Sequence, residues 1–406
     1  MKNLHRAWRD LFPVRGHYLS RPIVLFHSDD WVRAGIRDQE GFDKLRAGGL
    51  ALGDRPYDFY SLETAEDLHR LYEVLLRHRD SVGRPPCLVC NFILANVDFP
   101  RVIDSGFTKL YLLPLDQGLP GCWQRPGLLE TYREGIQKGI IYPALHGLTH
   151  FCQMSVEKAI QEKDERGSLL RILYSLDTPM IPERTPWAGF EYRSCLDGKN
   201  EGWLDFSSQR QLIGEGKRIF ERIFGMAPFS ACAPAYRANG DTLRGWKEAG
   251  IQVAQNGPGW GLAPYFDSNG LLHLHRNIPF EPFIDNQQCD EEHALAMAEA
   301  MFRSQRPAIV CTHSLNFHST LKNQRELTLE KLDRFLSLLE ASHADLLYIN
   351  DFDLWRIVKK GEWEWNGQRV TVPVSDRFEP SPAMAYYLRK AGKSLTPFVI
   401  KPTNFL

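Results

Sequence analysis

Two histidines, His146 and His150, stand four residues apart in this chain, and two adjacent carboxylates, Asp29 and Asp30, can complete a metal site with them. If a helix begins at or just after His146, both imidazoles can turn toward one point and bind one divalent cation. A catalytic metal keeps one coordination position open, so three protein ligands are expected. One aspartate would supply the third ligand, which leaves the other available as a base.

Explanations of these residues that involve no metal also stay open. Among 13 histidines in 406 residues, one pair with this spacing can arise by chance. Gly147 follows His146, so the pair is not the His-Glu-x-x-His motif of zinc proteases. The two aspartates can also be a helix N-cap and its neighbour, a common place for Asp after a strand.

The elements that must position these residues alternate between apolar runs and amphipathic stretches. The predicted strands are Ile23 to His27, Cys87 to Leu94, Ile140 to His146, Phe229 to Pro234, Ile251 to Gln255, Leu271 to His275, Ala308 to His313 and Asp345 to Ile349. The predicted helices are Ala65 to His78, Ser207 to Phe224, Thr242 to Ala249, Glu291 to Arg303 and Thr328 to His343. This alternation predicts a parallel α/β fold, and a (β/α) barrel fits it better than an open sheet.

Two stretches depart from the alternation. Residues 151–209 lack clean periodicity and contain three prolines and several aromatics, which predicts a long loop insertion near the cleft. From Gly361 onward, short strands and turns predict a small extension packed on the barrel. The expected organisation is therefore a catalytic barrel over residues 1–360, with its insertion at about 151–209, and a C-terminal extension over 361–406.

The chemically capable residues all follow predicted strands. Asp29 and Asp30 follow the first, His146 the third, Tyr236 the fourth and His313 the seventh. In parallel barrels the loops at the carboxyl ends of the strands converge on one mouth, so these groups are expected to meet there.

Composition narrows the classes of function. A formal net charge of −1 gives no case for nucleic acid or an anionic membrane as partner. Ten Trp and 23 Phe suit a cleft that stacks sugar rings, or simply a large core. No signal sequence or transmembrane run is visible, and several cysteines fall in apolar runs, where reduced thiols pack as small hydrophobes. A cytoplasmic location is expected, and the oligomeric state stays open.

Four segments of the chain together resemble the motifs of a known family. Residues 27–31 read His-Ser-Asp-Asp-Trp, residues 146–150 read His-Gly-Leu-Thr-His, residues 234–236 read Pro-Ala-Tyr, and residues 309–313 read Ile-Val-Cys-Thr-His. They resemble the Thr-Phe-Asp-Asp-Gly, His-Ser/Thr-x-x-His, Arg-x-Pro-Tyr and Leu-x-His motifs of the polysaccharide deacetylase family, also called NodB-like or carbohydrate esterase family 4. The resemblance covers roughly residues 20 to 356.

The resemblance implies a distorted (β/α) barrel of seven or eight parallel strands that holds one divalent metal ion, with Zn²⁺ expected. Its motifs place the metal on Asp30, His146 and His150. They make Asp29 the general base and His313 the general acid. The backbone amide of Tyr236 would help to hold an oxyanion.

Two departures from the family pattern matter. The arginine that orients the catalytic aspartate has no counterpart, because Ala231 to Ala233 occupy its place, and Arg237 and Arg193 are the candidates to replace it. Trp31 stands where the family has glycine, so a bulky ring is expected at the site mouth, where it would narrow the pocket or stack on substrate.

The leading hypothesis is a metal-dependent hydrolase that removes acetyl from an N-acetylated sugar or a related amide. One alternative is a small-molecule amidase that opens C–N bonds on the same fold. Another is a catalytically inactive, carbohydrate-binding barrel, which the missing arginine favours and the five retained acidic and histidine residues oppose.

Overall fold

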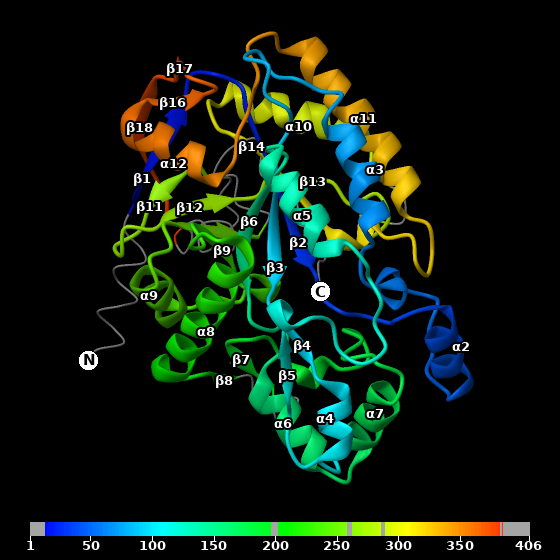
Figure 1. The fold of residues 1–406 in the computed structure, drawn as a ribbon. Helices are drawn as coiled ribbons and strands as arrows, with labels where there is room; N and C mark the ends of the chain where they lie inside the picture. Colours follow the sequence, from blue (N-terminus) through cyan, green and yellow to red (C-terminus); the bar gives the residue numbers. More distant parts are fainter. Residues whose placement is uncertain (1–12, 196–201, 258–261, 286–288, 382–383, 385–406) are drawn as a thin grey trace.

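The computed structural model describes residues 13–195, 202–257, 262–285, 289–381 and 384. Its centre is a curled sheet in the order β13-β14-β2-β3-β6-β9-β10-β12-β11-β1-β18, and β15 pairs additionally with β2 (Figure 1). The parallel strands are β2 (Ile23–Trp31), β3 (Leu88–Ile93), β6 (Ile141–Gly147), β9 (Ser230–Cys232), β10 (Val253–Asn256), β12 (Leu272–His275), β13 (Ile278–Pro279), β14 (Ala308–His313) and β15 (Leu347–Tyr348). The antiparallel members are β1 (Val14–Leu19), β11 (Tyr265–Phe266) and β18 (Val374–Glu379).

The helices complete an α/β fold. They are α2 (Gln39–Ala47), α3 (Ala65–Leu75), α4 (Phe99–Asp104), α5 (Leu128–Gln137), α6 (Gln153–Gln161), α7 (Glu165–Tyr174), α8 (Phe206–Phe224), α9 (Gly240–Glu248), α10 (Glu291–Arg303), α11 (Arg325–Ser342) and α12 (Asp351–Lys360). Among the described helices, none has the length and apolar character that crossing a membrane requires. The fold is a distorted barrel, which confirms the predicted class.

The barrel is distorted because its two ends meet without pairing. The parallel strands run from β13 to β12, and only Arg276 and Asn277 separate these two strands in the chain. Within the described residues, β12 and β13 form no ladder with each other. Asn277 instead bonds the backbone of residues 307 and 309, its Nδ2 and Oδ1 atoms lying 3.0 and 2.8 Å from their partners. The chain therefore crosses the open seam of the barrel at Arg276.

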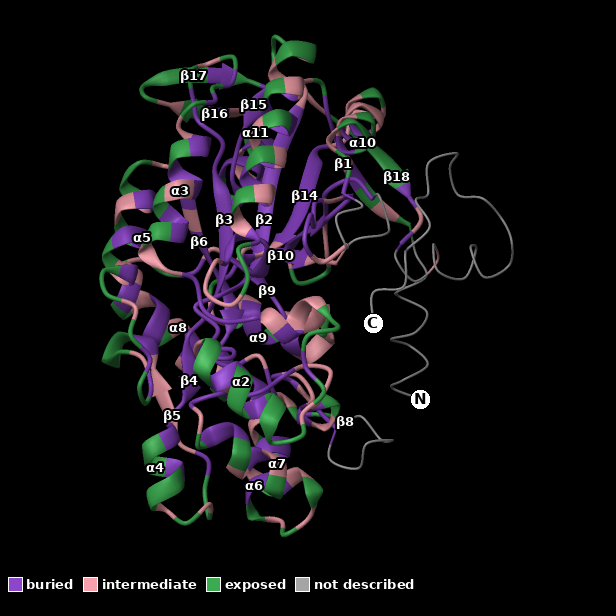
Figure 2. Cartoon of the chain, turned by 90° about the vertical axis from the view of Figure 1, so that its right-hand side faces the viewer, coloured by how far each residue is buried: buried purple, intermediate pink, exposed green. Residues whose placement is uncertain are grey.

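Alternation along the strands divides the core into two layers. Val24 and Phe26 of β2 face outward into the cluster that packs the sheet against helices such as α3 and α11. Ile23 and Leu25 face inward and join apolar side chains of β10, β12 and β14 with α12. Because side chains alternate, His27 and Asp29 continue the inward face of β2. Figure 2 shows the resulting buried sheet between more exposed helices.

All eight predicted strands fall on strands of this sheet, but the sequence missed several elements. The segment expected as a loop contains α6 and α7, and a two-stranded pair, β7 (Arg193–Ser194) with β8 (Gly202–Trp203). Together with α4 and the pair β4 (Ala95–Val97) and β5 (Leu112–Pro114), α6 and α7 gather at the end toward which β2 and β3 point (Figure 1). Beyond residue 360 the structure describes the hairpin β16 (Glu362–Trp365) and β17 (Gln368–Thr371), followed by β18. The proposed domain division at residue 360 stays a prediction.

Candidate active site

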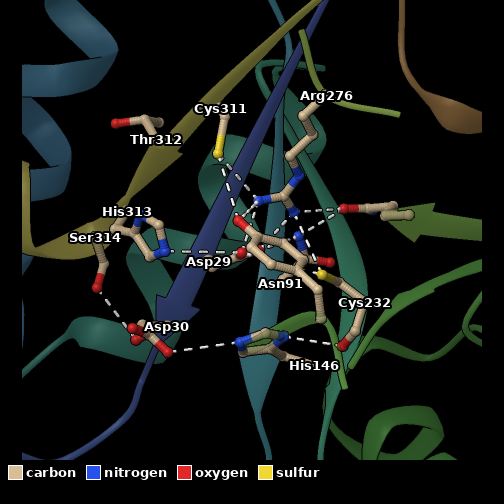
Figure 3. Close-up of polar contacts among 12 residues, drawn as sticks. Asp29, Asp30, Asn91, His146, Cys232, Arg276, Cys311, Thr312, His313 and Ser314 are labelled. Atoms are coloured by element: carbon tan, nitrogen blue, oxygen red, sulfur yellow. Dashed lines mark hydrogen bonds and ion pairs between the residues drawn. The ribbon is translucent and has the colours of Figure 1, made fainter. Parts of the chain in front are cut away.

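Asp29, Asp30, His146 and His313 lie together at the carboxyl ends of the parallel strands (Figure 3). Asp29 and Asp30 lie just before the last residue of β2, and His146 just before the last residue of β6. His313 is the last residue of β14 and lies directly beside Asp29 in the register. His150 lies just beyond β6, with its side chain 19% exposed, whereas Asp29 and Asp30 are 3% exposed. The group is therefore nearly enclosed by protein.

Two bulges aim these side chains. Between β2 and β3 the register shifts after Ser28, and Asp30 adopts a φ of 70°, a left-handed conformation that Asp tolerates better than most residues. Between β3 and β6 the register shifts again around His146. A bulge inserts one extra residue and turns its side chain away from the regular alternation. The bulge in β2 thus lets two neighbouring carboxylates point to different partners.

Asp30 forms one half of the site. Its Oδ1 atom lies 3.5 Å from Nε2 of His146 and 3.2 Å from Nε2 of His150. Its Oδ2 atom accepts from Nη1 of Arg33 at 3.0 Å. Nδ1 of His146 lies 2.9 Å from the carbonyl oxygen of Cys232, which can only accept, so Nδ1 carries the proton and Nε2 presents a lone pair toward Asp30.

This donor set fits a divalent cation. The ligand atoms of Asp30, His146 and His150 lie within 4.8 Å of one another, and Oδ1 of Asp30 is buried without a hydrogen bond from any described residue. Although burial alone would raise it, the charge of Arg33 holds the pKa of Asp30 well below its usual range. Burial and the charge of Arg33 lower the pKa of His150, which favours the neutral imidazole that metals bind.

A second group of three potential ligands overlaps the first and fits less well. Asp29, His146 and Cys232 also bring ligand atoms within 4.8 Å of one another. However, Nη2 of Arg276 lies 3.5 Å from the Cys232 sulfur, and its charge opposes a cation there. Burial also raises the pKa of the Cys232 thiol, which keeps it protonated. The Asp30 group is the better candidate.

Asp29 forms the other half, and an arginine that the sequence interpretation missed holds it. Arg276 donates from Nη1 to Oδ2 and from Nη2 to Oδ1, both at 2.6 Å, and is completely buried. Nδ2 of Asn91 donates to Oδ1 at 2.8 Å. Although burial alone would raise it, the Arg276 charge holds the pKa of Asp29 well below its usual range.

The two arginines proposed from the sequence were therefore wrong. Arg237 is exposed, and the guanidinium of Arg193 lies over the Trp203 ring, 5.3 Å from its centroid. Arg276 takes this position from the two-residue link between β12 and β13, where the chain crosses the barrel seam. The sequence held one signal for it, since Arg276 directly follows a predicted strand, at the level where the other site residues stand.

His313 is polarised by a partner that the sequence also did not reveal. Its Nδ1 lies 2.6 Å from Oε1 of Glu281, and its Nε2 lies 3.9 Å from Oδ2 of Asp29. Asn316 donates to the other Glu281 oxygen at 2.6 Å. Burial would lower the pKa of His313, but the Glu281 carboxylate outweighs it and raises the pKa to about 10. His313 is therefore protonated near neutral pH and can donate a proton.

Trp31 does not line the site mouth, which corrects the prediction. It is fully buried, and its ring packs against Tyr132 and Phe317 at centroid distances of 6.1 and 5.8 Å. The bulge in β2 turns the ring into the core instead of toward substrate. Trp260, which follows the fifth predicted strand in a glycine-rich stretch, lies outside the described residues.

Tyr236 lies at the site, but its amide is already used in this conformation. The amide donates to the carbonyl of Ala233 at 2.8 Å, within the short helix η4 (Pro234–Tyr236), so it is not free to hold an oxyanion. The Tyr236 hydroxyl accepts from Nη1 of Arg276 at 2.9 Å. Its side chain therefore covers the arginine that holds Asp29.

Glu191, in the segment after α7, anchors the loop between the two histidines. Its Oε1 accepts from the Leu148 and Thr149 amides at 2.5 and 3.4 Å. Gly147 has a φ of 120°, and a Cβ atom there would lie 2.1 Å from Oε2 of Glu191. The glycine is required both by its backbone and by this carboxylate. Burial raises the pKa of Glu191 to about 7.

Comparisons with known proteins give likeness in fold only. No family model matches the chain, and no curated protein matches it in sequence. Two solved structures assigned as polysaccharide deacetylases, from Mycobacterium smegmatis and from Pseudomonas aeruginosa PAO1, are each 13% identical over 84% of this chain, covering 90% and 92% of theirs, with TM-scores of 0.42 and 0.44. The allantoinase Puue is 12% identical over 83% of this chain and 90% of its own, with a TM-score of 0.45. At these values we base no statement about activity on them.

Proposed function

We propose that this protein is a metal-dependent hydrolase that removes an acetyl group from an N-acetylated sugar or a related amide. The observation that carries the proposal is the Oδ1 atom of Asp30, which accepts no hydrogen bond from a described residue and faces two imidazole nitrogens beside a second, fully held carboxylate. Asp30, His146 and His150 would hold the cation. A bound Zn²⁺ or similar ion supplies Lewis acidity and makes a nearby water more acidic.

The chain's own groups divide the proton transfers between them. Asp29 remains ionised and oriented by Arg276, so it can accept the proton of the attacking water. Its depressed pKa makes it a weak base, which suits only a water that is already acidified. Protonated His313 donates to the nitrogen of the leaving amine, because expelling an amide anion is far too costly near neutral pH.

Two alternatives compare differently with this geometry. The inactive barrel drew its support from the missing arginine, but Arg276, in the link between β12 and β13, holds Asp29 with two hydrogen bonds and so weakens that alternative. The small-molecule amidase is favoured by the near-enclosure of the site. Among the side chains placed as ligands, base and acid, only His150 and His313 exceed a tenth in exposure, at 19% and 21%. This limited exposure suits a small amide or the end of a sugar chain better than the middle of a polymer.

The test combines metal analysis with a substrate screen. We expect close to one divalent ion per chain, and release of acetate from chitooligosaccharides or from small N-acetyl compounds. The His146→Ala/His150→Ala variant serves as the control for both measurements. Full hydrolysis by that variant, or no hydrolysis of any N-acyl compound by the zinc-loaded protein, would overturn the proposal.

A further inference from the structure

A buried amide beneath the site touches both groups that hold Asp29. Oε1 of Gln255 on β10 accepts from Nδ2 of Asn91 at 2.8 Å and from Nη2 of Arg276 at 3.0 Å. The same two nitrogens bind Oδ1 of Asp29, at 2.8 and 2.6 Å. Gln255 is 3% exposed. One amide oxygen thus fixes the two donors whose positions define where Asp29 sits.

The other end of this amide is fixed as well. Nε2 of Gln255 donates to Oδ2 of Asp351 at 2.8 Å, and Oδ1 of Asp351 lies 2.7 Å from Nε2 of His27. A carboxylate only accepts, so the Gln255 amide must keep its oxygen toward Asn91 and Arg276. Asp351 is the first residue of α12, where the helix dipole favours a negative charge. The contact series therefore runs from α12 through Gln255 to Asp29.

The barrel interior does not require the buried polar contacts of Gln255 and Asp351 to be filled. The inward layer next to it is apolar, with Leu25, Val253 and Ile309 among its members. Buried polar groups cost free energy unless every partner is supplied, and an apolar filling avoids that risk. Such a costly arrangement, directed at one carboxylate, indicates a role at the site above it.

We propose that Gln255 and Asp351 are positioning residues, which hold Arg276 and Asn91 in the orientation that aims Asp29 at the attacking water. The inference rests on the proposed hydrolase function. Neither residue touches substrate. The amide of Gln255 and the guanidinium of Arg276 do not pass protons between acids, so the effect on Asp29 is one of placement. A displacement of about 1 Å at a reacting group can cost on the order of 100-fold in rate.

A side-chain exchange tests this directly. Gln255→Glu alone sets a second carboxylate against Asp351, and Asp351→Asn alone removes the acceptor charge. The double variant Gln255→Glu/Asp351→Asn restores the pairing in reverse, since the new amide donates to the new carboxylate, and it leaves the net charge unchanged. Its Asn oxygen can still accept from His27.

We expect Gln255→Glu to lower kcat roughly 10- to 100-fold with KM changed less than about threefold. The double variant should recover kcat to within about threefold of the natural protein. Gln209→Leu is the matched control. Gln209 is an equally buried amide with two hydrogen bonds, to Leu204 and Thr242, and its loss should lower Tm while leaving kcat unchanged.

Crystal structures of the same variants give a readout independent of turnover. Gln255→Glu should show the two-bond contact between Arg276 and Asp29 broken or shifted, and the double variant should show it restored, with equal zinc content in both. Unchanged kcat in a folded Gln255→Glu protein, or no recovery in the double variant, would overturn the inference. If Gln255→Glu does not fold, the double variant compared with Asp351→Asn decides in the same way.

The two hypotheses fail separately. If the natural protein hydrolyses no N-acyl compound, the proposed function fails and the crystal structures still decide the positioning role. An intact contact between Arg276 and Asp29 in Gln255→Glu would then reject it.

Discussion

The two aspartates at the end of β2 are neighbours in sequence but lie in opposite kinds of environment. We define the Asp29 side as Asp29, Arg276, Asn91 and Gln255, and the Asp30 side as Asp30, His146, His150 and Arg33. On the Asp29 side, both carboxylate oxygens accept hydrogen bonds from buried donors at 2.6 to 2.8 Å. On the Asp30 side, Oδ1 has no hydrogen bond from the described part of the chain and faces two imidazole nitrogens.

The difference separates a fixed group from an exchangeable one. A carboxylate whose acceptor sites are filled by protein donors is oriented before any ligand arrives. A carboxylate and two imidazoles that turn lone pairs toward one another become complementary to a cation. Protein donors occupy both carboxylate oxygens of Asp29, whereas no described residue donates to Oδ1 of Asp30. The two aspartates are therefore suited to opposite roles.

The largest expected effect comes from breaking the Asp30 side. The His146→Ala/His150→Ala variant should lose its metal, because a single carboxylate holds a cation poorly, and kcat should fall about 1,000-fold or more. Metal per chain by mass spectrometry and acetate release measured together check this. The matched control is His69→Ala, which removes a histidine that is 48% exposed on α3 and should change neither quantity. Retention of one ion per chain in the double variant would show that the site has been misassigned.

Breaking the Asp29 side should separate chemistry from metal binding. Asp29→Asn keeps the shape but removes the proton acceptor, so we expect a full metal complement with a loss of about 100-fold or more in kcat. Asp30→Asn should instead lower metal content and activity together. Metal content and turnover of the two variants, measured side by side, provide the comparison. Equal metal loss in both would mean that the two sides do not differ as described.

The proposed general acid, His313, provides the next test. Amide cleavage needs protonated His313, so activity is present below the His313 pKa and is lost as pH rises through it, a value of about 10 without bound metal. Removing the Glu281 charge lowers that pKa, so Glu281→Gln should move the alkaline loss of kcat to lower pH. The measurement is a pH profile on an amide and on an activated ester. The ester needs no proton on its leaving group, so its alkaline limb should not follow the substitution.

Some residues of the site could be predicted from the sequence, and others could not. Asp29, Asp30, His146 and His313 were predicted to lie together at strand ends, and they do, because strand ends in a parallel barrel converge and strands can be recognised from apolar runs. Arg276 could not be assigned to Asp29, because its approach depends on where the barrel fails to close. The direction of the Trp31 ring could not be predicted from the sequence either, since a one-residue bulge decides which way it turns.

The smallest predicted effect concerns Glu191, which anchors the loop on the Asp30 side. It is measured as a change in the stability of the folded protein. Burial raises the pKa of Glu191 to about 7 in the folded protein, above the ordinary value of 4.5. Between these values the folded state retains a proton that the unfolded chain has released, so the free energy of unfolding falls as pH rises through this window. A pKa difference of this size corresponds to roughly 3 kcal/mol as an order of magnitude, at about 1.4 kcal/mol per pKa unit. Glu191→Gln keeps an acceptor for the Leu148 amide and does not titrate, so its unfolding free energy should depend less on pH.

Denaturant unfolding of metal-free protein at pH 5 and pH 7.5 measures the difference, because other titrating groups cancel between the two proteins. Parallel pH dependence in both would mean that Glu191 is ionised throughout, and the loop between the metal-binding histidines would then be held by a charge, as Asp29 is.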